Sequence, residues 1–222
     1  MRTGKLPEHT LKRSILNPIR YRSKDIAFRS AIGHDGAVLG NMVTSIATTA
    51  FCYTGNEMYA LDTAINNIIA AGGRPYGISV AILMPEHSDE AVLRAIMDRL
   101  AISAEAYRVD IMTGHTELVP SVVQPTVTIT AYGTVLWKNQ HEKVREDMDI
   151  VMTKWVGLYG GAILAKLKEA ELTTRYPLSY VRKAASYMDA TSLMPELSVI
   201  EAAVAENPDC ILAAHDVSNG GI

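Results

Sequence analysis

The segment from Met58 to Met84 constrains the fold of this chain more than any other. Apolar residues from Met58 to Ala71 recur with the spacing of one helical face, and Gly72-Gly73 ends the pattern as a helix C-cap does. The apolar run from Gly77 to Met84 has the length of a buried strand. Because this helix and strand follow each other so closely, the segment predicts a layer of helix packed on sheet.

The flanking segments extend this layer. Residues 36–50 indicate one strand or two short paired strands. Ser88 is the expected cap of a second amphipathic helix, in which Glu90 and Arg94 have the spacing of a stabilising ion pair. Val109 to Met112 predicts a strand that leads into the polar turn Thr113–Glu117.

A further strand is indicated where Val127, Ile129 and Ala131 alternate with threonines. The order β-α-β-α-β-β predicts an α+β fold, with a mixed sheet and two helices on one of its faces. Two helices cannot cover both faces of such a sheet. These three apolar side chains are therefore expected to be buried in a symmetric homodimer.

A charged stretch from Lys138 to Asp149 has the composition of a linker and predicts a domain boundary. It separates a first domain over residues 26–138 from a second α+β domain over 149–222, and residues 1–25 are expected to form a helical N-terminal extension. Because the chain stops on a glycine-rich turn after an expected strand, the second domain is expected to be incomplete. In that domain we expect strands at 150–155 and 210–213 and helices near 160–169, 178–188 and 196–206.

Composition excludes several classes of protein. Apolar residues make up 48% of the 222 residues, which indicates a globular core. The formal net charge of −3 lacks the basic excess of nucleic-acid-binding proteins, and no apolar stretch approaches the roughly 20 residues that span a bilayer. Cys52 and Cys210 have no spacing typical of zinc sites or disulfide frameworks. We therefore expect a cytoplasmic protein that binds neither nucleic acid nor membranes.

Three acidic residues beside glycine or threonine turns are candidates for chemistry: Asp35, Glu117 and Asp216. Carboxylates that hold Mg²⁺ against phosphate groups are the usual machinery of phosphoryl transfer. Glycines such as Gly220-Gly221 let backbone N–H groups approach a phosphate, although most such clusters are plain turns and caps. His115 is a candidate general base near neutral pH, and a structural role is its alternative.

Four segments occur in the order in which the aminoimidazole ribonucleotide synthetase (AIR synthase) superfamily has them. They resemble its asparagine-containing helix, its strand-end motif, the opening of its second domain and its glycine-rich turn, and lie at 64–75 (AINNIIAAGGRP), 113–117 (TGHTE), 149–158 (DIVMTKWVGL) and 215–221 (HDVSNGG). The resemblance covers residues 26–222 and is strongest to the HypE-like, hydrogenase-maturation branch. It implies a first domain of the PurM type that closes a β-barrel with its twin in a homodimer, and ATP and Mg²⁺ as cofactors.

The resemblance also implies roles for residues at the matching positions. Asp35, Asn67 and Glu117 are expected to contact Mg²⁺ and the triphosphate. Asp35, Glu117 and His115 are the expected catalytic groups. The expected nucleotide-binding residues are Asn66, Asn67, Gly114, Thr116, Asp216, Gly220 and Gly221.

Three positions depart from the family pattern, because His34, Ile46 and Asn67 stand where acidic residues are usual. Fewer carboxylates predict a weaker Mg²⁺ site or a changed acceptor. The leading hypothesis is HypE-like, ATP-dependent phosphoryl transfer to a carboxamide-type oxygen, with a hydrogenase-maturation protein as a candidate partner. Two alternatives stay open: a dimeric binding or regulatory relative that has lost catalysis, and a small-molecule kinase of the thiamine-monophosphate kinase type.

Overall fold

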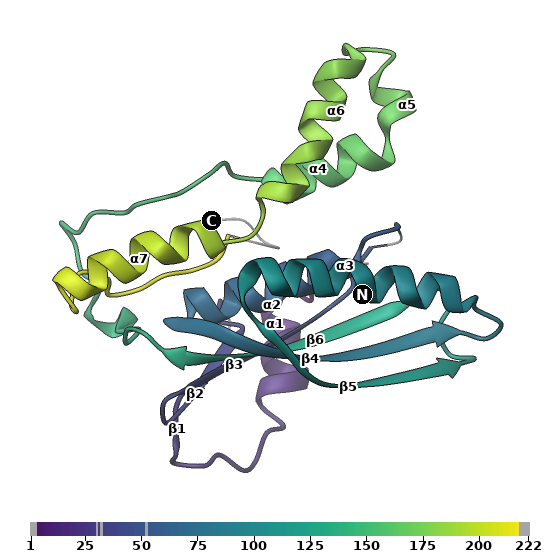
Figure 1. Cartoon of the computed structure of the whole chain (residues 1–222). Helices are drawn as coiled ribbons and strands as arrows, with labels where there is room; N and C mark the ends of the chain where they lie inside the picture. The colour runs from purple at the N-terminus through teal and green to yellow at the C-terminus, as the bar shows by residue number, and fades with distance from the viewer. Residues whose placement is uncertain (1–3, 30, 32, 52, 218–222) are drawn as a thin grey trace.

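Residues 26–135 form a mixed six-stranded sheet with two long helices (Figure 1). The computed structural model describes residues 4–29, 31, 33–51 and 53–217. The helices are α2 (Glu57–Ala70) and α3 (Glu90–Tyr107). The strands are β1 (Ile26–Phe28), β2 (Gly36–Leu39), β3 (Met42–Thr48), β4 (Gly73–Pro85), β5 (Asp110–Val119) and β6 (Thr126–Val135).

The strand order is β1-β2-β3-β6-β4-β5. Strands β4 and β5 are parallel, because the crossover helix α3 connects them, and every other pair is antiparallel. Both helices lie on the same face of the sheet (Figure 1). The predicted α+β fold, with two helices on one face of a mixed sheet, is therefore confirmed, and residues 36–50 form two short paired strands.

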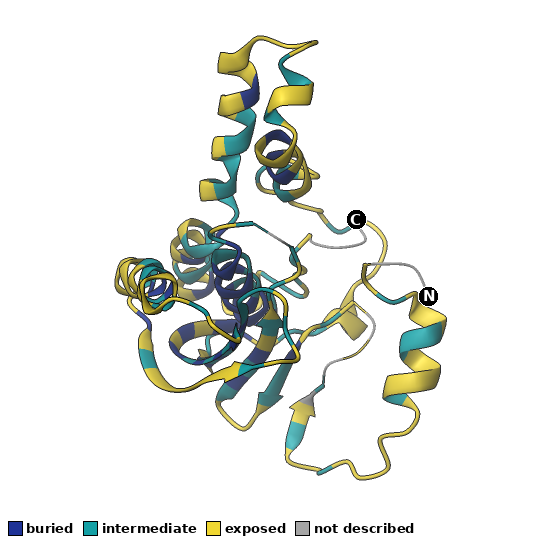
Figure 2. Cartoon of the chain, turned by 90° about the vertical axis from the view of Figure 1, so that its right-hand side faces the viewer, coloured by how far each residue is buried: buried dark blue, intermediate teal, exposed yellow. Residues whose placement is uncertain are grey.

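The core lies between these helices and the sheet, where Figure 2 shows the buried residues gathered. Helix α2 contributes Leu61, Ile65 and Ile68, all completely buried. Val127, Ile129 and Ala131 are completely buried against the same helices. The expectation that a second copy buries these three residues is therefore wrong, because the alternation in β6 turns its apolar side chains toward α2 and its threonines toward the open face.

Gly72 ends helix α2 as the sequence predicts. Its φ of +91° is one that residues with a Cβ rarely adopt, and its N–H donates to the Ile69 carbonyl at 3.0 Å. The Gly72 carbonyl accepts from the N–H groups of Leu136 and Trp137, at 2.8 and 3.1 Å. This glycine therefore joins the end of α2 to the segment that follows β6.

Helix α3 begins one residue later than expected. The cap is Asp89, whose side chain accepts from the Ala91 N–H at 2.8 Å, whereas the Ser88 hydroxyl donates to the Pro85 carbonyl. The ion pair between Glu90 and Arg94 forms at 2.7 Å. Asp89 accepts a hydrogen bond from an N–H group in the first turn of the helix, as Ser88 was expected to do, so the shift of the cap by one residue does not change the predicted helix.

The polar segment Thr113–Glu117 is not a turn. It continues β5, which runs without a break from Asp110 to Val119 along the edge of the sheet. Gly114 allows this pairing, because a Cβ there would lie 2.5 Å from the Val80 carbonyl oxygen on β4. An edge strand has a neighbour on one side only, and many of its side chains can therefore be polar. A polar sequence of this kind is also typical of a turn.

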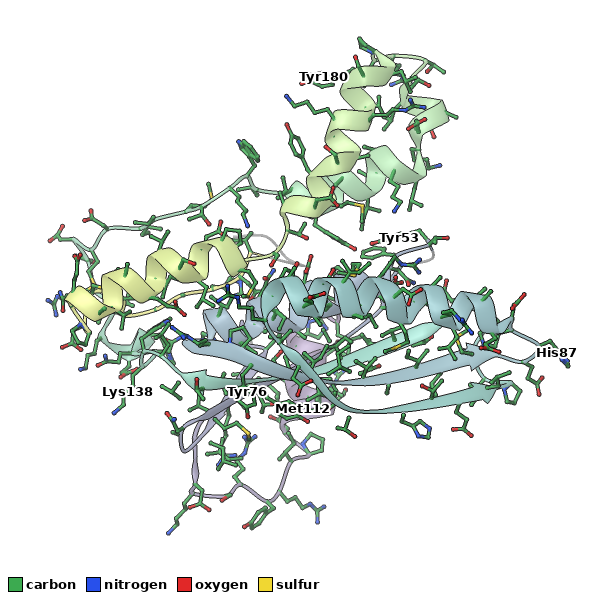
Figure 3. The ribbon with its side chains drawn as sticks, in the orientation of Figure 1. Tyr53, Tyr76, His87, Met112, Lys138 and Tyr180 are labelled. Carbon is green, nitrogen blue, oxygen red and sulfur yellow. The ribbon has the colours of Figure 1, made fainter. Side chains whose placement is uncertain are left out.

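After β6, the regular elements of the described chain are helices. Helices α4 (Leu158–Leu167), α5 (Glu169–Leu172) and α6 (Leu178–Ser186) project away from the sheet, with Tyr180 on the projecting arm, whereas α7 (Met194–Glu206) lies beside α2 (Figures 1 and 3). The strands expected at 150–155 and 210–213 do not form among the described residues. Ile150 is 97% exposed and pairs with no strand, and strand-type alternation without a partner backbone does not make a strand.

Residues 8–16 form the expected N-terminal helix, as α1 (Glu8–Leu11) and a π-helical continuation, η1 (Lys12–Leu16). The helix has no buried residue and stands apart from the sheet in Figure 2. Within the described chain, none of the helices combines the length and the apolar character that crossing a membrane requires. Lys5, which precedes this helix, forms an ion pair at 3.2 Å with Asp35 in the loop before β2.

Candidate functional site

A cleft forms where three segments meet beside the C-terminal end of α2. The loop before β2 contributes Gly33 to Gly36, and α2 contributes Asn67, Ala70 and Ala71. The third wall is the segment Ala214–Asp216, which lies about 150 residues further along the chain than Asn67. Gly36 permits this close packing, because a Cβ there would lie 2.7 Å from the Ala71 Cβ. The cleft thus combines Asp35, Asn67 and Asp216, three of the residues that the sequence singled out.

Asn67 and Asp216 hold the cleft closed. Asn67 is almost fully buried, and its amide nitrogen, in the orientation that satisfies its neighbours, donates to both carboxylate oxygens of Asp216 at 3.1 and 3.2 Å. The enclosed space is only about 10 Å³, room for roughly one water molecule. A ligand larger than an ion must therefore displace Ala214–Asp216 before it can bind.

The charged groups of the cleft are perturbed by burial. Burial raises the pKa of Asp216 to about 6, with Asp35 adding to the rise and His215 opposing it. Burial also lowers the pKa of His34, as do the nearby imidazoles of His141 and His215. The cleft is therefore an environment in which Asp216 and His34 are held toward their neutral forms.

Asn66, next to Asn67 in the chain, points to a different partner. Its Nδ2 donates to the Thr191 carbonyl at 2.9 Å, and its Oδ1 accepts from the Leu193 N–H at 2.8 Å. Both polar atoms of the side chain thus hold the turn before α7 against α2. The structure accounts for Asn66 through this contact rather than through the cleft.

Asp62, one helical turn before Asn66, binds the same turn. Its two carboxylate oxygens accept from the Tyr107 hydroxyl and the Thr191 hydroxyl, each at 2.7 Å. Thr191 has a single hydroxyl proton, yet its oxygen also lies 2.8 Å from the Met188 carbonyl. A protonated Asp62 would satisfy both positions, because it could donate to Thr191 while Thr191 donates to Met188. This agrees with burial raising the pKa of Asp62 above 3.8.

We expect docking of this turn to weaken as pH rises. Because the folded-state pKa of Asp62 is raised, its protonated form contributes stability that is complete below pH 3.8 and is lost as pH rises through the folded-state value. Asp62→Asn has no such titration. Urea unfolding should therefore show wild type gaining stability relative to Asp62→Asn when the pH is lowered from 7 to 4.

The exposed Asp98 on α3 supplies the control for this measurement. Asp98→Asn should follow wild type at both pH values. An equal difference between wild type and Asp62→Asn at pH 7 and pH 4 would contradict the coupling.

The structure does not bring Gly114, His115, Thr116 and Glu117 to the cleft. They lie on β5, where the exposed His115 and Glu117 contact each other at 3.2 Å. Four strand spacings and about six residues separate Glu117 from the row of Gly36, which amounts to roughly 25 Å. In Figure 3 His87 marks the end of the sheet near Glu117, and Lys138 marks the opposite end, where α2 terminates. Gly220 and Gly221 lie outside the described residues.

Ile46 also lies away from the cleft. It pairs with Thr130 on the open face of the sheet and is 63% exposed, whereas its neighbour Ser45 is buried and donates to the Ala64 carbonyl of α2. An acid introduced at Ile46 would therefore face outward from the sheet. Within one chain, only His34 and Asn67 of the three departures from the family pattern lie in the cleft.

Sequence reasoning overlooked Ala70, Ala71 and His141. Both alanines line the cleft, and the Ala71 Cβ is the atom that a Cβ at Gly36 would approach to 2.7 Å. His141 lies in the short helix η2 (His141–Lys143), and its ring centre is 5.1 Å from that of His34. Small residues at the end of α2 were a detectable signal, whereas nothing in the charged stretch around His141 indicates its contact with His34.

Comparisons with known proteins agree with this fold. Residues 35–135 match the family described as AIR synthase related protein, N-terminal domain. The carbamoyl dehydratase HypE of Rhodobacter capsulatus is 26% identical over 215 residues, which cover 94% of this chain and 59% of that protein. The chain thus spans less than two thirds of the length of this relative.

Two solved structures share the fold at low identity. The AaThiL complex with AMPPCP and TMP has a TM-score of 0.57 at 15% identity and covers 81% of this chain and 58% of that chain. HypE of E. coli has a TM-score of 0.52 at 17% identity, over 61% of this chain and 48% of that chain. The sheet, its two helices and the family match together confirm the resemblance: residues 35–135 match the N-terminal domain of AIR synthase related proteins, and the chain is similar to HypE.

Proposed function

We propose that this protein binds a nucleotide in the cleft between the Gly33–Gly36 loop, the end of α2 and Ala214–Asp216. The observation that supports the proposal most directly is the meeting of a glycine-rich loop, Asn67 and Asp216 at a junction of separate elements. The similarity to HypE and the fold shared with AaThiL in its complex with AMPPCP and TMP are consistent with it.

The side chains present do not fit Mg²⁺ as the family pattern implies. Asp35 is paired with Lys5, and Asp216 is occupied by Asn67. Among the described residues, no group of three or more His, Cys, Asp or Glu side chains is arranged to hold a metal. Nucleotide binding should therefore depend only partly on Mg²⁺, because the ion would be held mainly by phosphate oxygens and water.

For the reaction, we infer phosphoryl transfer from ATP to a carboxamide-type oxygen, by analogy with the carbamoyl dehydratase relative. A binding protein without catalysis is the second candidate, and the separation of Glu117 from the cleft favours it. Phosphate release from ATP, measured with and without a carboxamide acceptor, distinguishes the two. Acceptor-dependent release supports the enzyme, and nucleotide binding without release supports the binding protein.

Ala70→Glu tests the position of the nucleotide. A carboxylate at the wall of the cleft should exclude phosphate groups by bulk and by charge, so calorimetric affinity for ATP should fall at least about tenfold. Ala101→Glu makes the same substitution on the exposed face of α3 and should leave the affinity unchanged. If both variants are folded, as thermal unfolding can show, equal affinities for ATP would mean that the nucleotide does not bind in the cleft.

Glu117→Gln tests whether β5 takes part in the same site. Because Glu117 is roughly 25 Å from the cleft within one chain, this variant should bind ATP as wild type does. A loss as large as that of Ala70→Glu would place β5 of a second copy beside the cleft, and would support the family pattern over the single-chain geometry.

We also propose a homodimer through the open face of the sheet, which exposes Ile46 and Leu39. Replacing Ile46 by Asp would put a charge at the centre of such an interface and should shift sedimentation toward monomer. Wild-type protein that sediments as a monomer at tens of micromolar would end this proposal. The hydrogenase-maturation partner and the cytoplasmic location stay predictions from the resemblance and composition.

A further inference from the structure

A cluster of aromatic rings joins the projecting helices to the first domain. We call α4, α5 and α6 (residues 158–186) the arm, because they pack on one another and project away from the sheet (Figure 1). On the domain side, Phe51 and Tyr53 lie in the loop before α2, and Tyr59 lies in its first turn. On the arm side, Tyr159 comes from the first turn of α4. We name these four residues the aromatic clasp.

Tyr159 is the centre of the aromatic clasp. Its ring centre lies 4.7 Å from that of Tyr59 and 6.0 Å from that of Phe51, distances at which aromatic pairs attract each other. Its hydroxyl is hydrogen-bonded to the Tyr53 hydroxyl at 2.5 Å. In Figure 3, Tyr53 lies on the side of the two long helices that faces the arm. One side chain of the arm therefore contacts all three aromatic residues of the domain.

Lys166 reinforces the contact two turns further along α4. Its ammonium group lies 4.8 Å from the centre of the Tyr53 ring, a cation–π distance, and donates to the Thr54 carbonyl at 3.3 Å. Because Lys166 and Tyr159 are seven residues apart, they lie on one face of the helix. This face is turned toward the domain, whereas Leu164 on the opposite face is 61% exposed.

The two ends of the arm are held at a second place, beside the turn before α7. Lys154, which precedes α4, donates to the Ser192 carbonyl at 2.5 Å and forms an ion pair with Glu196 at 3.0 Å. Thr191, which follows the arm, is hydrogen-bonded to Asp62 of α2. The entry and the exit of the arm thus lie side by side. A lobe whose two ends share one attachment can turn about it as a unit.

The backbone that enters the arm has the conformation of a hinge. Lys154 has a φ of +61° and Gly157 a φ of +72°, in the left-handed region that residues with a Cβ rarely adopt. A lysine in this region is strained, and hinges lie in short segments of this kind at the ends of elements. Val156, between the two, is 54% exposed. A rotation at this segment therefore disrupts little core packing.

We propose that the arm is a movable lobe, hinged between Lys154 and Gly157 and held closed on the first domain by the aromatic clasp. Opening separates the Tyr159 ring from the three rings of the domain and exposes all four rings to solvent. Helix α7 stays docked during this movement, because Asn66 holds the turn before it independently of the clasp. The described structure is the closed position of the lobe.

Double electron–electron resonance between two nitroxide labels tests the proposal on the full chain without nucleotide. The labels are attached at Tyr180→Cys on the arm and Ile102→Cys on α3, two exposed positions, after Cys52 and Cys210 have been replaced by Ser. An intact clasp should give one narrow distance distribution. Tyr159→Ala should raise the fraction of molecules at other distances at least about tenfold, because two ring contacts and a hydrogen bond are lost together.

Two further variants of the labelled protein make the measurement specific. Tyr176→Ala is the matched control, because it removes a tyrosine of the arm that is 52% exposed, and it should keep the narrow distribution. Tyr159→Phe keeps the ring and loses only the hydroxyl, so its open fraction should lie between those of the intact clasp and Tyr159→Ala. A broad distribution with the clasp intact would overturn the proposal, as would a narrow and unchanged one in Tyr159→Ala.

Hydrogen exchange distinguishes a turning lobe from local unfolding. In Tyr159→Ala, the amides around the buried Val181 of α6 should keep their protection, and so should those of α7. Loss of protection throughout α4–α6 would mean that the arm unfolds instead of turning, which contradicts the proposal. Because no nucleotide is present, these results do not depend on nucleotide binding in the cleft.

Discussion

Substitution of Gly72 by Ala is expected to lower the free energy of unfolding by roughly 3–5 kcal/mol. Two costs add. The φ of +91° is strained for any residue with a Cβ, and that Cβ would lie 2.4 Å from the Trp137 carbonyl oxygen. The oxygen belongs to the backbone, so α2 and the segment after β6 would have to move apart. Urea unfolding followed by circular dichroism measures the loss.

Gly55 provides a matched control for this substitution. It has the same φ of +91°, but a Cβ there would meet nothing within 4 Å. Gly55→Ala should therefore show the backbone cost alone, about 1–2 kcal/mol. Equal losses of unfolding free energy at the two glycines would show that the backbone at Trp137 moves away from the new Cβ at little cost. The contact between Gly72 and Trp137 would then be less rigid than the structure indicates.

Arg99→Ala is expected to be similarly severe, at about 3 kcal/mol or more. The Arg99 guanidinium donates through Nε to Glu57, a carboxylate in the first turn of α2 that is only 1% exposed. Without Arg99 this buried charge would have lost its ion-pair partner. Its place at the N-terminus of α2 offsets part of the cost through the helix dipole, which keeps the expected loss near the lower end of the range for broken buried pairs.

Arg94→Ala is the control on the same helix. Its partner Glu90 is an exposed i,i+4 neighbour, so the expected loss is at most about 0.5 kcal/mol. Adding Glu57→Gln to the Arg99→Ala variant should recover part of its lost stability, because the unpaired charge disappears. No recovery in the double variant would attribute the loss to packing of the Arg99 side chain rather than to charge.

The elements of the first domain follow from local patterns. Helix α2 was predictable from its apolar face and Gly72, and the alternation in β6 indicated a half-buried strand. These signals depend on neighbouring residues and are therefore visible in one sequence. The same alternation did not show which face of the sheet the helices cover, and so the burial of Val127 was assigned to the wrong partner.

The candidate site divides in the same way. Asp35, Asn67 and Asp216 were selected for their residue types and motif positions, and the structure brings them together. Glu117 was selected by the same reasoning but lies across the sheet, because the Thr113–Glu117 segment continues an edge strand. Whether a polar segment bends or pairs depends on the strand beside it, here β4, and no local pattern contains that information.

The sequence by itself determined the α+β class, the two helices, and the residue types available for nucleotide chemistry, because each rests on composition or short-range periodicity. Only the tertiary structure decided that Asn66 docks the turn before α7 while Asn67 meets Asp216. It also placed His34 beside His141. These contacts join residues more than 100 positions apart, and the packing of α2 against two separate segments creates the contacts of Asn66 and Asn67.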